Sequence, residues 1–193
     1  LGLTHGDLKP SNIMLEPSGA IRILDFGLAS KADTQATTSM LQQDPQGTIA
    51  YMAPERLLGA PLAPQVDIYA LGVIFYELLN SQRPFAELNG LALAAALVQS
   101  SSDQWNYSRA LSPTLIHLVR RMTAKQPAQR LLSMTEFLVA LDNVEKEIPF
   151  NGMDELDKRI PVNESIEPSQ QLNKKQLRKK HFKNAVLLSV LII

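Results

Sequence analysis

The sequence predicts a mainly α-helical domain that carries one small β-ribbon. Two observations lead to this fold class: four segments between residues 66 and 148 have helical patterns, and one short stretch near the amino terminus is β-branched enough for a strand. The 193 residues, 45% hydrophobic and 20% charged, are typical of a globular protein and suffice for one sizeable core. We expect this domain to occupy residues 1–147.

The β-ribbon and a long loop are expected in the first 48 residues. Residues 20–27, AIRILDFG, alternate in polarity and follow a turn at residues 16–19, EPSG, so they predict a short strand. Residues 28–48 are polar, lack periodicity and are rich in Thr, Ser, Ala and Gln, which indicates a long exposed loop. A loop of this length inside a compact domain usually has a function.

Four helices are expected after this loop. Residues 66–80 are apolar on nearly every side and lie between two prolines, so they predict a buried central helix. The other three are expected at residues 89–100, 112–124 and 133–148. Ser112 is the expected N-cap of the third helix. Ser133 and Glu136 have the spacing of a capping box at the start of the fourth.

The charges are distributed unevenly along the chain. Six of the 19 basic residues lie within residues 174–183 and no acidic residue follows position 173, so residues 1–173 carry 13 basic against 19 acidic groups. This acidic balance argues against nucleic acid as a partner of the domain, because binding a phosphate backbone needs a concentrated positive surface. The sequence has no cysteine and three scattered histidines, which excludes disulfides and thiolate metal sites.

Three side chains of complementary chemistry lie close together in THGDLKPSNIML, residues 4–15. They are the carboxylate of Asp7, the ammonium group of Lys9 and the amide of Asn12. A second carboxylate, Asp25 in LDFG, follows Asp7 by 18 positions, far enough for a β-ribbon to bring both acids to one cleft. Alone, DLKPSN would in most proteins be a capped turn, since its residues favour turns.

A further motif, GTIAYMAPE at residues 47–55, closes the long loop. With the motifs above, it makes residues 1 to about 145 resemble the larger, C-terminal lobe of a eukaryotic-type protein kinase. No segment corresponds to the glycine-rich loop, the strand lysine or the helix glutamate of that family, which belong to its N-terminal lobe. We therefore interpret the chain as a piece of a longer protein that, by itself, binds nucleotide poorly and transfers nothing.

The resemblance implies ATP and Mg²⁺ as cofactors and gives five residues a role in their chemistry. Asp7 corresponds to the catalytic base for the substrate hydroxyl, and Lys9 corresponds to the cation that meets the transferring phosphoryl group. Asn12 and Asp25 correspond to the magnesium ligands, hard oxygen donors that suit this ion. Met14 is expected beneath the adenine ring, and an ordinary core methionine is the alternative.

Other positions match supporting residues of the family. Asp67 is expected to anchor the backbone of the catalytic loop from below, or else only to complement the dipole of its helix. Glu55 and Arg130 are expected to form a buried ion pair rather than a surface pair. Thr48 is expected to hydrogen-bond toward the catalytic aspartate and lysine. The remaining supporting positions are His5, Phe26 and Gly27.

The motifs resemble the serine/threonine branch of the family, because Lys9 directly follows Leu8 and GT precedes AYMAPE. Protein substrates with Ser or Thr hydroxyls are therefore expected. Gly6 stands where the family's commonest form has an arginine that pairs with a phosphorylated loop residue. Another arginine, such as Arg22, is the alternative partner. The candidate phosphorylation sites are Thr34, Thr37, Thr38 and Ser39.

The last 46 residues predict a membrane attachment. Residues 148–173 contain three prolines and scattered charge, which indicates a flexible linker. The basic juxtamembrane block at 174–183 precedes an apolar run at 184–193, which we interpret as the start of a transmembrane helix, although a full span needs about 20 residues. A solvated amphipathic tail and a nuclear-localisation-like patch are alternatives.

This order of segments resembles bacterial transmembrane serine/threonine kinases, which implies a single-pass protein of the inner membrane with the lobe in the cytoplasm. A catalytically silent pseudokinase scaffold that recruits partners at the membrane is the rival hypothesis. The motifs argue against this rival, because a scaffold would not require four polar residues that are intact here: Asp7, Lys9, Asn12 and Asp25.

Overall fold

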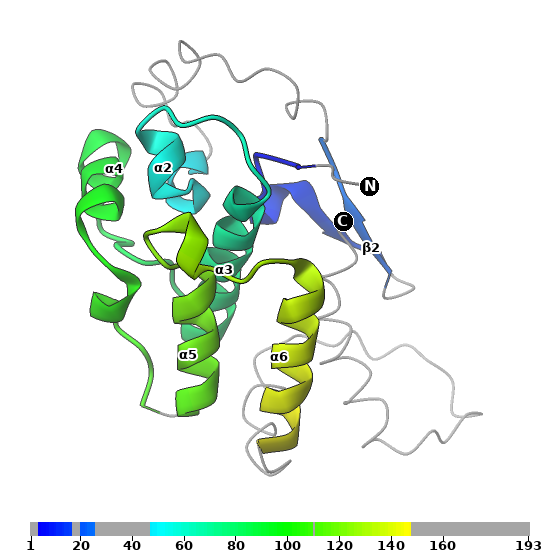
Figure 1. The fold of residues 1–193 in the computed structure, drawn as a ribbon. Coiled ribbons are helices and arrows are strands. Elements are labelled where there is room, and N and C mark those ends of the chain that lie inside the picture. Colours follow the sequence, from blue (N-terminus) through cyan, green and yellow to red (C-terminus); the bar gives the residue numbers. More distant parts are fainter. Residues whose placement is uncertain (1–3, 17–19, 26–46, 110, 148–193) are drawn as a thin grey trace.

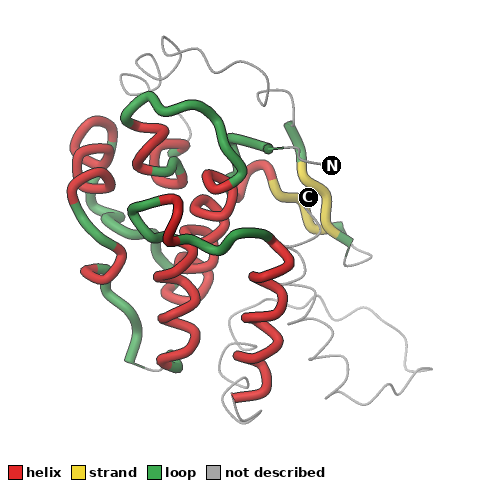
Figure 2. The backbone as a smooth tube through the Cα atoms, viewed as in Figure 1, coloured by secondary structure: helices red, strands yellow, loops and turns green. Residues whose placement is uncertain are grey.

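The computed structural model describes residues 4–16, 20–25, 47–109 and 111–147. Helices dominate this part of the chain, and a two-stranded sheet lies at its side (Figures 1 and 2). The expected mainly helical fold with a small β-ribbon is therefore confirmed. The predicted linker, basic block and apolar run, residues 148–193, lie outside the described residues.

The sheet is an antiparallel ribbon of strands β1 (Ile13–Leu15) and β2 (Ile21–Ile23), in which Met14 pairs with Arg22. The N–H of Glu16 donates to the carbonyl oxygen of Ala20 at 2.8 Å and closes the hairpin. Strand β2 is shorter than the predicted residues 20–27. The extended backbone ends before Asp25, whose φ of 61° lies in the left-handed region.

Helix α3 (Gln65–Asn80) forms the centre of the core, as the sequence predicts, and all its residues from Val66 to Tyr76 are buried. It lies between the ribbon on one side and helices α2 (Pro54–Leu57) and α4 (Gly90–Gln99) on the other (Figure 1). Gly72 faces helix α5 (Pro113–Met122), where a Cβ atom would lie 2.7 Å from the side chains of Met122 and Thr123. The glycine therefore allows the two helices to pack closely.

The ends of the later helices are fixed by serine side chains. The Ser112 hydroxyl accepts a hydrogen bond from the N–H of Leu115 at 3.2 Å, so the predicted N-cap of α5 is confirmed. At helix α6 (Met134–Glu147), the Ser133 hydroxyl accepts from the N–H of Glu136 at 3.2 Å. In a capping box the Glu136 carboxylate would accept from the N–H of Ser133. Here it accepts instead from the N–H of Leu132 at 2.7 Å.

A short 3₁₀ segment, η3 (Thr48–Tyr51), joins the end of the predicted loop to the helical body. The prediction extended the loop to residue 48, whereas Thr48 already belongs to this segment. Ile49 and Ala50 are buried against α4 in a second apolar cluster that also contains Leu93, Ala94 and Leu97. This packing holds the polar side chain of Thr48 at a fixed place beside residues 5–12.

Candidate active site

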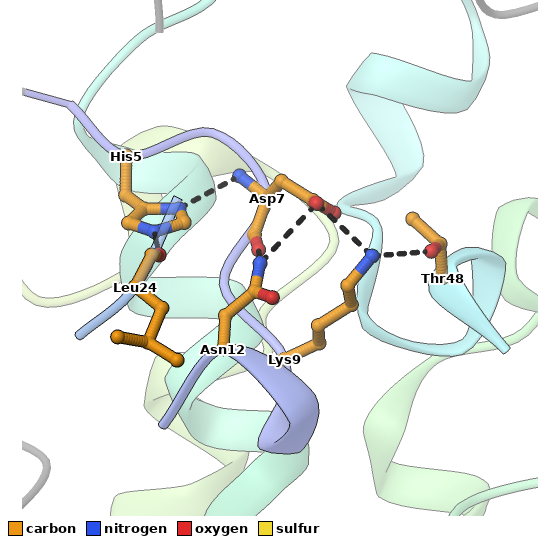
Figure 3. A network of polar contacts seen from close by, with 6 residues as sticks. All are labelled: His5, Asp7, Lys9, Asn12, Leu24 and Thr48. Carbon is orange, nitrogen blue, oxygen red and sulfur yellow. Dashed lines mark hydrogen bonds and ion pairs between the residues drawn. The ribbon is translucent and has the colours of Figure 1, made fainter. Parts of the chain in front are cut away.

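Asp7, Lys9 and Thr48 form a chain of polar contacts (Figure 3). The ammonium Nζ of Lys9 lies 3.0 Å from Oδ2 of Asp7 and donates to the hydroxyl of Thr48 at 2.8 Å. The side chains of Lys9 and Asp7 are only 10% and 14% exposed, so this ion pair is shielded from most of the solvent. The carboxylate is therefore held by a cation on one side.

Asn12 holds the same carboxylate from the other side. The residue ends the 3₁₀ turn η1 (Pro10–Asn12), and its Nδ2 donates to the backbone oxygen of Asp7 at 2.8 Å and to Oδ2 of Asp7 at 3.3 Å. Both donors belong to the amide nitrogen, so the orientation of the amide is fixed. Its Oδ1 remains the acceptor end, which can meet a cation.

The ring of His5 links the segment around Asp7 to the end of the ribbon. Its Nδ1 accepts from the N–H of Asp7 at 3.2 Å, and its Nε2 lies 2.9 Å from the carbonyl oxygen of Leu24. A carbonyl oxygen can only accept, so these partners require the neutral tautomer with its proton on Nε2. Leu24 also donates its N–H to the carbonyl oxygen of Asn12 at 2.9 Å. The Leu24 peptide is thus clamped on both sides.

Asp25 directly follows this clamp. Its φ of 61° lies in the left-handed region, and its side chain is exposed. Because Leu24 is hydrogen-bonded to both His5 and Asn12, the backbone of Asp25 is held beside these two residues. The amide of Asn12 and the carboxylate of Asp25 are the donor set that Mg²⁺ accepts, since this ion prefers oxygen ligands and keeps several waters.

Within residues 4–16, 20–25, 47–109 and 111–147, no group of three or more His, Cys, Asp or Glu side chains could hold a metal ion. Phe26 and Gly27 lie outside the described residues, as do the candidate phosphorylation sites, Thr34, Thr37, Thr38 and Ser39.

Asp67, near the start of α3, binds the backbone just before Asp7. Its Oδ2 accepts from the N–H of His5 at 2.7 Å and its Oδ1 accepts from the N–H of Gly6 at 2.8 Å. Burial raises the pKa of this carboxyl, and the hydrogen bonds from Gly6 and His5 oppose that rise. The residue is 2% exposed, so its contacts go well beyond complementing a helix dipole.

Glu55 and Arg130 face each other in a bidentate pair, with NH1 to Oε1 at 2.6 Å and NH2 to Oε2 at 2.7 Å. The side chain of Arg130 is fully buried and that of Glu55 is 19% exposed. The guanidinium also donates to three backbone carbonyls and lies 4.9 Å from the centre of the Tyr69 ring. The geometry is that of the buried pair rather than a surface pair.

Met14 and Arg22 face each other across the ribbon, away from the core. Met14 is 44% exposed, so in this chain it is not a core methionine. An exposed apolar side chain two positions after Asn12 suits the face of a flat aromatic ligand. Arg22 is engaged by the carboxylate of Glu16 in an exposed ion pair.

Three features of the site were not predicted from the sequence. The Leu24 clamp involves backbone atoms, which carry no sequence signal. The left-handed turn at Gly6, with a φ of 79°, could have been suspected from the glycine itself. Tyr51 donates its hydroxyl to Glu77 at 2.6 Å, and burial followed by the Glu77 carboxylate raises the pKa of the tyrosine. This bond ties η3 to the end of α3.

The structure contains no candidate for membrane insertion in the part of the chain that it describes. No helix there is both long enough and apolar enough to cross a bilayer. The apolar run at residues 184–193 lies outside that part, so its predicted role stays a prediction.

Comparison with known proteins gives consistent matches. Residues 1–140 match the protein kinase domain. The chain is 35% identical over 140 residues to the serine/threonine-protein kinase PknA of Mycobacterium tuberculosis, covering 72% of this chain and 32% of that protein. It is 38% identical over 149 residues to the serine/threonine-protein kinase Pkn1 of Myxococcus xanthus, covering 72% of this chain and 21% of that protein.

A third relative extends further along this chain. The probable serine/threonine-protein kinase PknB of Lactococcus lactis subsp. lactis is 32% identical over 171 residues, covering 84% of this chain. That match spans 27% of the relative's length. The chain thus covers a third or less of each of these three relatives.

Proposed function

The chain belongs to the protein kinase family, and from this membership we propose that it forms the larger, C-terminal lobe of a serine/threonine protein kinase. The whole protein transfers the γ-phosphoryl group of ATP to Ser or Thr hydroxyls of other proteins. The observation that carries the proposal is the arrangement around Asp7, whose carboxylate lies 3.0 Å from Lys9 Nζ and 3.3 Å from Asn12 Nδ2.

The proposed reaction uses this arrangement directly. Asp7 orients the substrate hydroxyl and accepts its proton, while the hydroxyl oxygen bonds to the γ-phosphorus and the bond from that phosphorus to the bridging oxygen of ADP breaks. Lys9 places a positive charge beside the same carboxylate, where the transferring group carries negative charge. The buried Asp67 holds the backbone on which Asp7 sits.

The oxygen donors of Asn12 and Asp25 fit the magnesium ion that this chemistry uses. When bound, the ion would neutralise charge on the phosphates. Asn12 contributes a fixed orientation, because both of its Nδ2 hydrogen bonds go to Asp7. Asp25 contributes its carboxylate from the end of the Leu24 clamp. Met14 offers its exposed side chain beside the adenine of the nucleotide.

The 193 residues contain no counterpart of the family's glycine-rich loop or strand lysine, so the chain by itself should transfer no phosphate. The activity test therefore uses the whole protein. Purified protein, labelled ATP, Mg²⁺ and a Ser/Thr-containing protein substrate should give labelled product. The Asp7→Asn variant should lose about 99% or more of this transfer, as expected when a general base is removed. A wild-type protein that binds nucleotide but transfers nothing would favour the pseudokinase scaffold.

We propose in addition that the whole protein is attached to the inner membrane with this lobe in the cytoplasm. Support comes from the sequence alone: the basic block at 174–183 precedes the apolar run at 184–193, as at cytoplasmic membrane boundaries. Cell fractionation should find the whole protein in the membrane fraction, and external protease should leave the lobe intact in spheroplasts. A whole protein found only in the soluble fraction would contradict this proposal.

A further inference from the structure

We propose that Leu62 is a positioning residue for the catalytic aspartate, because its side chain holds the turn at Gly6 in place. This inference rests on the proposed kinase function for its activity readout. It concerns a contact between an apolar side chain and a glycine Cα, outside the polar network around Asp7.

The contact between Leu62 and Gly6 is revealed by placing a Cβ atom on the glycine. A Cβ atom on Gly6 would lie 2.8 Å from Cδ1, 3.3 Å from Cδ2 and 3.7 Å from Cγ of Leu62. The isobutyl group of Leu62 therefore lies against the Cα of Gly6, in the space that a Cβ atom at position 6 would enter. The φ of 79° adds a second reason for glycine, since L-residues rarely adopt this conformation.

Leu62 is itself held firmly. It is half-buried and packs against the main apolar core, and Pro61 and Pro64 restrict the backbone around it. Before it, the N–H of Ala60 donates to the carbonyl oxygen of Glu55 at 2.9 Å, and Glu55 is fixed by Arg130. After it, the chain enters α3, which carries Asp67. These contacts fix the backbone on both sides of Leu62.

The turn at residues 5–7 is thus held from two directions by one short stretch of chain. Asp67 binds the N–H groups of His5 and Gly6, and Leu62, five positions earlier, covers the Cα of Gly6. Asp7 follows immediately, so a shift of Gly6 moves its carboxylate relative to Lys9 and Asn12. Removing the Leu62 side chain should loosen this geometry without touching a group that meets substrate.

The test is a double-mutant cycle in the whole protein. Gly6→Ala should lower kcat by about tenfold to a hundredfold, because a small misplacement of a catalytic group has such an effect. Leu62→Ala alone should lower kcat by about threefold to tenfold with the KM for ATP unchanged, since the nucleotide ligands stay in place. Adding Leu62→Ala to Gly6→Ala should raise kcat and the unfolding temperature above those of Gly6→Ala alone.

The rescue by a second truncation is the decisive result, because two independent losses would only add. Leu62→Met, which keeps an apolar side chain of similar volume, should retain most of the activity. Leu58→Ala, at a neighbouring leucine that is 72% exposed, is the matched control and should change neither quantity. A double variant that is no better than Gly6→Ala in kcat or unfolding temperature overturns the inference. If wild-type protein transfers no phosphate, the proposed function fails, and the unfolding temperatures still decide the Gly6–Leu62 coupling.

Discussion

The Arg130 guanidinium and the Glu55 carboxylate form two parallel hydrogen bonds of 2.6 and 2.7 Å between residues 75 positions apart. The pair connects the helix that follows the Thr48 segment with the chain before α6. The guanidinium also donates hydrogen bonds to the carbonyl oxygens of Gln65, Ala124 and Lys125. Pairing and hydrogen bonds together offset the cost of burying this charge.

Removing one member of this pair should therefore be costly. We expect Arg130→Ala to lower the free energy of unfolding by about 3–5 kcal/mol, because it leaves the Glu55 carboxylate without its cation. Urea denaturation followed by circular dichroism measures this loss. The control is Arg22→Ala, which breaks the exposed pair with Glu16 and should cost at most about 1 kcal/mol. Equal losses in the two variants would show that burial does not decide the strength of these pairs.

Replacing the Asp67 carboxylate with an amide should destabilise the protein. Two backbone N–H groups point at its two carboxylate oxygens, so Asp67→Asn offers one acceptor and places an amide N–H₂ against the second donor. We expect a loss of about 1–3 kcal/mol in unfolding free energy, together with a lower kcat. Hydrogen exchange of the His5 and Gly6 amides, measured by NMR, should accelerate in the variant. Unchanged exchange would mean that neither bond depends on the second oxygen.

The two acids of the site should fail in different ways. Asp7→Asn keeps an oxygen near Lys9 but loses the proton acceptor, so turnover should fall by about 100-fold or more while Mg²⁺-dependent nucleotide binding persists. Asp25→Ala removes a magnesium ligand, so both transfer and Mg²⁺-dependent binding should be lost. Nucleotide titrations of the whole protein with and without Mg²⁺ separate these outcomes. Wild-type activity in the Asp25 variant would end the kinase interpretation.

Glu136 should make the free energy of unfolding decrease at acidic pH. The N–H of Leu132, followed by the Arg121 guanidinium, lowers the pKa of this carboxyl below its ordinary value. A lowered pKa in the folded state gives stability that is present above the unfolded value of about 4.3 and is lost as pH falls through the folded pKa.

The matched variant is Glu136→Gln, which keeps the shape and one acceptor. It should be less stable than wild type at pH 7 by at most about 1 kcal/mol, since the pair with Arg121 is partly exposed. The difference should shrink as pH falls through the lowered folded pKa of Glu136, because the wild-type carboxyl group then loses its charge. A difference that is constant from pH 7 to pH 3 would remove the charge from the explanation.

The sequence was a good guide wherever the signal is local. Helix α3 was predicted within one residue because an apolar segment lies between prolines, and Ser112 was identified as a cap because its hydroxyl acts on the next turn. Motif spacing brought Asp7, Lys9 and Asn12 together. The contacts that hold them depend on tertiary packing: Leu62 meets a glycine that has no side chain, and the Leu24 clamp uses peptide groups.

The last prediction concerns phosphorylation and follows from Gly6. The commonest form of the family has an arginine at this position, which pairs with a loop phosphate, whereas this chain has a glycine there, with Leu62 packed against it. The alternative partner, Arg22, is already paired with Glu16. Activity should therefore depend little on phosphates at four hydroxyl positions that lie outside the described residues, Thr34, Thr37, Thr38 and Ser39.

Changing all four hydroxyl residues to alanine in the whole protein tests this independence. We expect the variant to keep at least about half of the wild-type kcat, because a phosphate there would have no arginine at position 6 to bind. Phosphatase treatment of the wild-type protein should likewise have little effect, which controls for packing changes caused by the alanines. A loss of about a hundredfold in both experiments would mean that a loop phosphate does order the site, with a cation other than residue 6 as its partner.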